Sequence, residues 1–299
     1  MPPKQGYQIT SRPVRDLAWV ISSPPLVSGV INATHWWSHE KCLSEFNDCL
    51  PTLIQLDKNP QALINHLNAL KTTRLGLRFE AFITYWLMIS PNYKLLSKNI
   101  QIIEEGLTLG EIDFIIEEVN SQKIIHLEVA VKFYLGTPPY KDAYRWFGTN
   151  TKDQLGKKLD HLKQQQTQLS KKHKDHFQYE INERHCLIKG RLFYPIGTNR
   201  PPDGVTVNHL RGTWGHFKNY RNSDDLIPIN KIDWLAKLSH TDIIKRQKSP
   251  EKYLTHRAQC FVKIKNSHND DHSHLGEPQE DTRVFYLPED FTFPESTAI

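Results

Sequence analysis

The chain has 299 residues, of which 38% are hydrophobic, and 38 Lys plus Arg against 33 Asp plus Glu give it a formal charge of +5. This length predicts about two domains or one large elaborated domain, and the longest apolar stretch, residues 81–89, is far shorter than the ~20 residues of a membrane-spanning helix. Because the start shows no secretory signal and the four cysteines include no Cys-x-x-Cys pair, we expect a soluble, cytoplasmic protein without a disulfide framework or a zinc module.

A helical N-terminal region is predicted over residues 1–70. Apolar residues recur at helical spacing over 14–21 and 63–70. Prolines at 24–25 and at 51 interrupt this pattern, because proline lacks a backbone donor and disfavours helical geometry in the residue before it. We therefore expect short helices in this region, with poorly marked ends.

A clearer helix is predicted over residues 71–90. Glu80 lies on the flank of its apolar stripe, next to the side that we expect to be buried. The Ser90-Pro91 step ends the helix. The stripe is formed by residues at steps of four, three and four, namely Leu75, Phe79, Phe82 and Trp86.

Three strands, a second helix and a fourth strand are predicted next. The third strand is marked best, because its residues from His126 to Phe133 separate into two alternating faces. A short polar link between the second and third strands favours a hairpin. The order helix, three strands, helix, strand predicts an α/β fold with a mixed sheet between helices. The strands are expected at 99–103, 110–116, 124–134 and 186–194, and the second helix at 152–166.

The remaining chain is predicted to add little regular structure. Residues 71–195 form the expected core, and 196–265, which are rich in Pro and Gly at their start, form an irregular C-terminal extension packed on it. Residues 266–299 are expected to be a largely flexible tail, because their first half has almost no apolar residue. A solvated tail also accounts for three histidines that could otherwise bind a metal, namely His268, His272 and His274.

Charge is unevenly distributed along the core. Residues 101–118 hold six acidic side chains and no Lys or Arg, whereas residues 151–176 hold seven Lys against three Asp. An acidic strand region followed by a basic helix suits a cation site beside a phosphate-binding surface. Ordinary solvated faces would give the same runs of charge.

Carboxylates gather on the second and third predicted strands. Strand alternation places Glu111 and Asp113 on one face, and Glu128 on one face with Lys132. If the strands pair as a hairpin, Asp113 and Glu128 can meet, and two carboxylates about 5 Å apart repel by roughly 3 kcal/mol at an effective dielectric constant of about 20. Such a pair needs a cation or a shared proton, and hard oxygen ligands suit Mg²⁺ or Mn²⁺. Glu80 could hold a metal-bound water or a second ion.

Four sequence blocks of the core carry a family resemblance. They contain Glu80, the Gly-Glu-Ile-Asp113 motif and an apolar strand that bears Glu128 and a lysine. This combination resembles the PD-(D/E)XK nuclease superfamily. More narrowly, residues 74–170 resemble a bacterial family known only as a domain of unknown function and grouped with those nucleases. The four blocks are LGLRFEA (75–81), LGEIDF (109–114), HLEVAVKFYL (126–135) and KLDHL (158–162).

The resemblance implies a restriction-endonuclease-like core and a metal-dependent mechanism. It implies that Asp113, Glu128 and the carbonyl of Val129 hold Mg²⁺ or Mn²⁺, and that Glu80 assists through water. A lysine, Lys132 in this chain, would activate the nucleophile or steady the charge on the phosphate. The implied reaction is hydrolysis of phosphodiester bonds by a metal-activated water.

The resemblance also implies a partner. The substrate would be nucleic acid, with DNA favoured by analogy with the superfamily. Lys157, Lys158 and Lys163 of the second predicted helix would contact the phosphate backbone, the usual anchor that is independent of base sequence. We expect no membrane partner, and a homodimer stays open.

One position departs from the superfamily pattern. The pattern is Glu-x-Lys, but Ala130 stands where the lysine is expected, and Lys132 follows two residues later on the same face. Along a regular strand Lys132 starts roughly 13 Å from Glu128. A β-bulge could bring its amine back, or Lys157 or Lys158 could supply the charge instead.

Two other interpretations stay open. Asp113 and Glu128 could be ordinary outward carboxylates on half-exposed strands. Alternatively, the core could be a catalytically inactive, nuclease-like module that binds nucleic acid or protein through its basic helix. A divalent metal distinguishes these interpretations, because only a metal site predicts that Mg²⁺ raises the melting temperature and that Asp113→Ala abolishes the effect.

Overall fold

The computed structural model describes residues 8–219, 225–246, 257–268 and 275–295. The chain forms two compact units, each assembled from separate segments. Unit 1 comprises the segments that end at Lys132, at Gly190 and at His209, and unit 2 comprises the intervening segments and the C-terminal part. Their ranges are 1–132, 157–190 and 204–209 for unit 1, and 133–156, 191–203 and 210–299 for unit 2.

Unit 1 begins with helices, which confirms the helical character predicted for the N-terminal region. Pro51 lies inside one of them, α2, and does not end it. Ser38 caps the start of this helix, and its hydroxyl accepts a hydrogen bond from the Lys41 amide over 3.2 Å. Its apolar face, which includes the fully buried Cys49 and Leu53 on either side of the proline, keeps the helix packed. The helices are α1 (Arg12–Ser22), α2 (His39–Lys58), α3 (Gln61–Asn68) and α4 (Leu75–Ile89).

The sheet of unit 1 contains the four predicted strands, each longer than expected. β3 pairs with β4 and β4 with β5, both antiparallel, as the predicted hairpin requires. β7 is the next strand in the sheet order and also pairs in parallel with β2, part of a short hairpin that the sequence pattern did not reveal. The strands are β1 (Gly29–Ile31), β2 (Thr34–Trp36), β3 (Tyr93–Glu104), β4 (Leu107–Glu118), β5 (Ile124–Gly136) and β7 (Glu183–Pro195).

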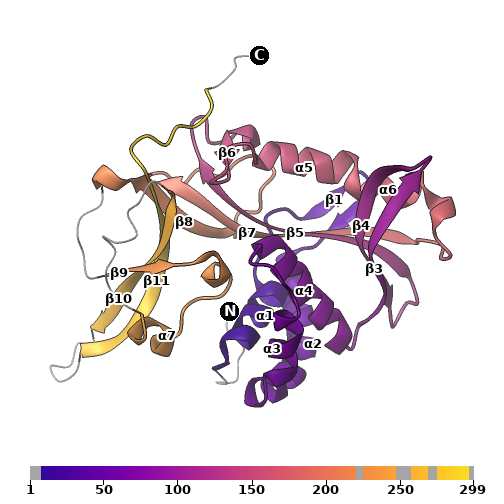
Figure 1. Ribbon diagram of the computed structural model, residues 1–299, viewed down its shortest axis with the longest axis horizontal. Coiled ribbons are helices and arrows are strands. Elements are labelled where there is room, and N and C mark those ends of the chain that lie inside the picture. Colours follow the sequence, from indigo (N-terminus) through magenta and orange to yellow (C-terminus); the bar gives the residue numbers. More distant parts are fainter. Residues whose placement is uncertain (1–7, 220–224, 247–256, 269–274, 296–299) are drawn as a thin grey trace. The chain divides into compact units, whose positions relative to one another are not determined.

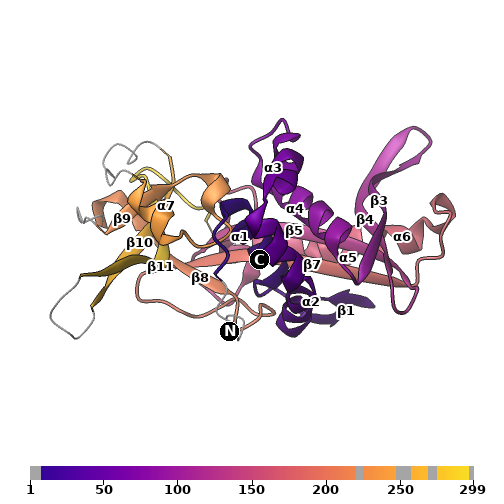
Figure 2. The same cartoon turned by 90° about the horizontal axis from the view of Figure 1, so that it is seen from below.

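Helices cover both faces of this sheet. Figure 1 shows α1–α4 on one side of it and α5 (Leu155–Gln164) on the other. The fold is therefore mixed α/β, and α4, β3, β4, β5, α5 and β7 follow one another along the chain with shorter elements between them. The short α6 (Leu169–Lys172) follows α5, and both views show it beside the long β3–β4 hairpin (Figures 1 and 2).

Unit 2 contains strands where an irregular extension and a flexible tail were expected. β8 pairs in parallel with β11, and β10 lies antiparallel between β11 and β9. The reason is that short apolar runs separated by polar segments form this sheet, whose aromatic residues Phe261 and Phe285 are buried. The elements are β6 (Trp146–Phe147), β8 (Leu210–His216), β9 (Leu226–Ile229), α7 (His240–Ile244), β10 (Gln259–His268) and β11 (Leu275–Leu287).

Short 3-10 helices complete the described chain. Among the described residues, no helix combines the length and apolar character that crossing a bilayer requires. His272 and His274 lie outside the described residues. The 3-10 helices are η1 (Ala143–Arg145), η2 (Gln166–Gln168), η3 (Lys174–His176), η4 (Phe217–Asn219) and η5 (Lys231–Asp233).

A buried lysine joins the first helix of unit 1 to its sheet. Lys189 of β7 is completely buried, and burial lowers the pKa of its ammonium group. Its Nζ donates to the carbonyls of Ile21 and Ser23 at the end of α1 and lies 3.1 Å from Cys42 Sγ of α2. The lysine thus binds carbonyl groups that a helix end leaves without intrahelical partners.

The residue after this lysine allows β7 to pass close to β5. Gly190 has a φ of +149°, and a Cβ atom built on it would lie 1.7 Å from the carbonyl oxygen of Lys132. Only glycine, which has no Cβ, permits this approach. Lys132 therefore lies at a point where the backbone of its strand is held closely from one side.

Candidate active site

Strands β4 and β5 separate where their carboxylates meet. Their residue pairing runs from Glu117↔Ile124 to Phe114↔Leu127. At the next position, the Asp113 amide donates to Glu128 Oε1 over 3.3 Å, and the Val129 amide donates to Asp113 Oδ2 over 2.8 Å. Side-chain oxygens thus replace the carbonyl acceptors of a regular ladder, and they bring Asp113 and Glu128 together on one side of the sheet.

Glu128 is the most deeply buried of these acids. Its side chain is completely buried, and Oε1 is 2.7 Å from His126 Nε2. Among the described residues, none donates a hydrogen bond to its second oxygen, Oε2. A buried carboxylate oxygen without a donor is unfavourable unless a proton or a cation occupies its lone pairs.

His126 connects this acid to a helix of unit 1. It is also completely buried, and its Nδ1 is 2.8 Å from the Ser170 hydroxyl of α6. Burial lowers the pKa of His126 to about 3, so the imidazole is neutral. It can donate from Nε2 to Glu128 while Nδ1 accepts from Ser170. His126 is therefore fully hydrogen-bonded and fixes one oxygen of Glu128.

The two acids share an environment that favours retention of a proton. Burial, and then the charge of Glu128, raise the pKa of Asp113 to about 7. Burial also raises the pKa of Glu128 to about 8, although the Asp113 amide and Lys158 oppose this shift. Two adjacent carboxylates cannot both ionise at low cost without a positive charge. Near neutral pH the pair therefore holds a proton or needs a cation.

Glu80 approaches this pair from α4. It is half-buried, and burial, followed by the charges of Asp113 and Glu111, raises its pKa to about 7. Because the charge of Asp113 affects the pKa of Glu80, the helix places Glu80 within electrostatic range of that strand carboxylate. Glu80, Asp113 and Glu128 do not form a set whose ligand atoms all lie within 4.8 Å of one another, a spacing that two other groups of described residues reach.

Lys158 lies on α5, which covers the other side of the sheet from α4. It is half-buried on α5, where its Nζ donates to Gln166 Oε1 over 2.7 Å. Its charge opposes the rise in the pKa of Glu80, Asp113 and Glu128. Burial and the neighbouring charge of Lys132 lower the pKa of Lys158 itself. Both candidate lysines thus lie near each other, and Lys158 is the cation coupled to all three acids.

The other lysines predicted for phosphate contact lie differently. Lys157 is exposed on α5, and Lys163 is half-buried near its end, where its backbone carbonyl accepts from Asn32 over 3.2 Å. Lys158 precedes Leu159 and lies three residues after Leu155, on the edge of the buried stripe of α5. That periodicity is the signal that separates Lys158 from its exposed neighbour.

The geometry fits a divalent cation held by Asp113 and Glu128. The donor set is hard carboxylate oxygen, which suits Mg²⁺ or Mn²⁺. Glu128 Oε2 is a buried ligand atom without a donor, and Val129 follows Glu128 directly on the strand. Because Glu80 does not complete a tight three-residue cluster, its contact with an ion would run through water.

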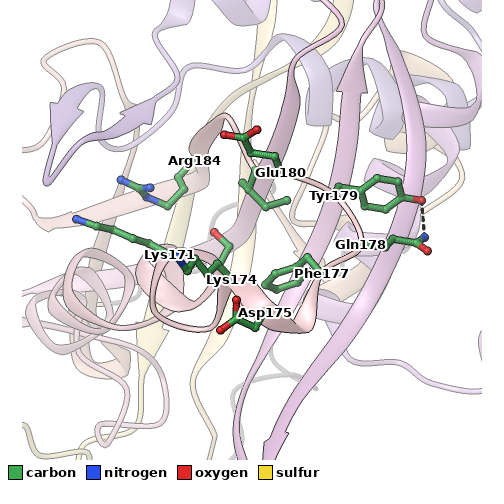
Figure 3. Close-up of a pocket in the computed structure, with 10 residues that line it drawn as sticks. Lys171, Lys174, Asp175, Phe177, Gln178, Tyr179, Glu180 and Arg184 are labelled. Atoms are coloured by element: carbon green, nitrogen blue, oxygen red, sulfur yellow. Dashed lines mark hydrogen bonds between the residues drawn. The ribbon is translucent and has the colours of Figure 1, made fainter.

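A pocket of about 580 Å³ lies next to Ser170. Three cationic, two acidic and two aromatic side chains of residues 170–184 are part of its lining. Figure 3 shows the ends of Lys171 and Arg184 together on the side away from Tyr179. The Nε of Arg184 is buried without a hydrogen-bond partner among the described residues. Through Ser170 and His126, two hydrogen bonds separate the wall of this pocket from Glu128. The sequence pattern gave no sign of this link.

Comparison with known proteins identifies a family. Comparison with curated proteins and with solved structures finds no match. Residues 15–285 match the family described as Domain of unknown function (DUF1853). This match spans both units and all the acids and lysines described above, so the chain belongs to the DUF1853 family.

Proposed function

We propose that unit 1 is a metal-dependent phosphodiesterase that hydrolyses nucleic acid, with DNA the favoured substrate. The observation that carries this proposal is the pair Asp113 and Glu128. The pKa values of both are raised, and Oε2 of Glu128 has no hydrogen-bond donor among the described residues. Perturbed carboxylates beside a half-buried lysine are typical of catalytic sites. The order helix, three strands, helix, strand supports the likeness to a restriction-endonuclease core.

Each residue has a role that follows from its position. Asp113 and Glu128, with the carbonyl of Val129, would hold Mg²⁺ or Mn²⁺, and His126 orients Glu128. The bound ion would lower the pKa of a water molecule and polarise the phosphate. Glu80, with a pKa of about 7, can accept a proton from an attacking water near neutral pH.

Lys158 is the proposed electrostatic partner of the phosphate. Its charge interacts with the carboxylates and with the charge of Lys132. A phosphate oxygen bound between α5 and the strand carboxylates would therefore meet positive charge. This assignment accounts for the absence of lysine at position 130. In the pocket beside Ser170, Lys171 and Arg184 offer positive charge for a further phosphate of the same strand, and Phe177 and Tyr179 offer rings for a base.

A cleavage panel tests the proposal. The full chain is incubated with single-stranded, duplex and branched DNA and with RNA, in Mg²⁺, in Mn²⁺ and in EDTA. We expect metal-dependent cleavage that Asp113→Asn and Glu128→Gln abolish. Glu117→Gln serves as the matched control, because Glu117 lies on the same strand and pairs with Lys94 instead, over 3.0 Å.

The outcomes separate the candidate functions. Binding of nucleic acid without cleavage, unaffected by metal, would identify an inactive nuclease-like module. Equal behaviour of wild type and both acid variants on every substrate would remove the hydrolytic function.

A further inference from the structure

A carboxylate and two imidazoles meet beside the end of the β3–β4 hairpin. Glu104 is the last residue of β3, and His173 and His176 flank the turn from α6 into η3. One ligand atom from each of the three lies within 4.8 Å of the other two. The rings of the two histidines are 5.8 Å apart between centroids. A 3-10 turn places side chains three residues apart on one face, which explains this proximity.

The hydrogen bonds of the two imidazoles are compatible with metal binding. His176 Nε2 lies 3.2 Å from the carbonyl oxygen of Ile103, so Nε2 carries the proton and Nδ1 is left with a lone pair. A histidine that donates one ring N–H to a backbone carbonyl is oriented as metal-ligating histidines are. His173 Nδ1 lies 2.6 Å from Glu104 Oε1, and a cation can replace the proton between them.

We propose that Glu104, His173 and His176 form a binding site for a transition-metal ion of the zinc class, separate from the carboxylate pair. Two imidazole nitrogens and one carboxylate oxygen suit Zn²⁺, with water in the remaining position. Ligand atoms around tetrahedral Zn²⁺ lie about 3.3 Å apart, so the side chains need only close slightly. Glu104 and His176 are exposed and can rotate to do so.

A second group of one carboxylate and two histidines shows how hydrogen bonding decides whether such a group can bind a metal ion. His35, Glu183 and His185 also bring their ligand atoms within 4.8 Å of one another. There, the Trp37 indole N–H donates to His185 Nδ1 over 3.1 Å, so the proton of this ring lies on Nε2, which faces Glu183 Oε2 at 2.8 Å. Trp37 can only donate. It therefore holds His185 in the tautomer that has no lone pair toward Glu183, and this group serves as an internal control.

Binding at the proposed site would tie two segments far apart in the sequence. The ion would join the end of β3 to η3, where Glu104 and His173 now share a single hydrogen bond. We therefore expect Zn²⁺ to raise the melting temperature of the full chain.

The experiment uses the full chain without an affinity tag, stripped with EDTA and titrated with Zn²⁺ against a chromophoric chelator. We expect one tight equivalent in the wild type and at least tenfold weaker binding in His173→Ala and in His176→Ala. Since His176 is exposed, its substitution should leave the fold intact. Co²⁺ added in place of Zn²⁺ should give visible absorption that the same variants lose.

Three controls locate the ion. His35→Ala should bind Zn²⁺ like the wild type, and so should Asp113→Asn, which removes a ligand of the proposed catalytic metal. A variant with His268, His272 and His274 all changed to Ala tests whether these three histidines bind the ion themselves. The proposal is overturned if this triple variant or His35→Ala loses the tight equivalent, or if His173→Ala and His176→Ala keep it.

Discussion

Asp113 and Glu128 each accept a hydrogen bond from the other's strand, at the point where the backbone ladder between β4 and β5 ends. The two acids therefore support the separation of the strands and also form the candidate site. Changing either one alters local structure and charge together, so isosteric amides are the informative substitutions.

Stability should fall as pH rises through neutrality. The pKa values of Asp113 and Glu128, about 7 and about 8, lie above the ordinary values of 3.8 and 4.5 that the unfolded chain has. In the folded state this pair of acids therefore binds more protons between pH 4 and 8, and the stability that the pair contributes is fully present below this range and lost as pH rises through it. We expect a loss of several kcal/mol, measured by urea unfolding in EDTA.

Asp113→Asn should flatten this pH dependence, because it removes one carboxylate from the coupled pair. Glu117→Gln, an exchange at a site paired with Lys94, should leave the slope unchanged. Equal stability of the wild type at pH 5 and pH 9 would contradict the assignment.

Mg²⁺ should counteract the same loss. At pH 8 it is expected to raise the melting temperature of the wild type, because a cation takes the place of the proton that the acids have released. The effect should disappear in Asp113→Ala and become small at pH 5, where protons compete with the ion. A shift of equal size at both pH values would show that Mg²⁺ binds elsewhere.

Lys158→Met should reduce phosphodiester cleavage on the order of 10²-fold, as removal of one electrostatic contact to a reacting group typically does. Lys152→Met is the control, since that side chain is exposed and lies ahead of α5. The same substitution at Lys158 should raise the pKa of the acids further, because Lys158 opposes the existing shifts. Steady-state rates and pH profiles of both variants check this.

Ser170→Ala should lower the free energy of unfolding by about 1–3 kcal/mol, because it leaves His126 Nδ1 buried without its partner. Ser121→Ala removes a serine whose bond to Glu118 is exposed, so little change is expected there. If the two variants unfold at the same urea concentration, the buried bond contributes nothing.

Gly190→Ala should destabilise the chain by more than about 3 kcal/mol, because the added methyl group meets the Lys132 carbonyl at a strained φ. Gly76→Ala, at an open position of α4, should instead raise stability by up to about 1 kcal/mol. Comparing the two unfolding midpoints tests whether the close approach of β5 and β7 is as tight as described.

The core elements of unit 1 could be predicted because their signals are local. The apolar stripe of α4, the alternation in β5 and the short link before β5 can each be recognised within one continuous stretch of sequence. The contact between Asp113 and Glu128 follows from the same hairpin. Contacts between distant segments carry no such signal, as the bond from His126 to Ser170, 44 residues later, illustrates.

Unit 2 shows the same limit on prediction from local sequence, over a longer separation along the chain. Its parallel pair of strands joins Leu210–His216 to the end of Leu275–Leu287, across a long intervening segment. Each apolar run is short and flanked by polar residues, so composition favoured an extension and a tail. Only pairing between remote segments makes these runs into strands.

The lysine inside β7 has a practical consequence for dissecting the molecule. Lys189 binds carbonyls of Ile21 and Ser23 and lies beside Cys42, so a chain shortened to start at residue 71 would deprive this ammonium group of these three partners. The first helix is therefore part of what holds unit 1 together. The smallest autonomous fragment must begin ahead of Arg12.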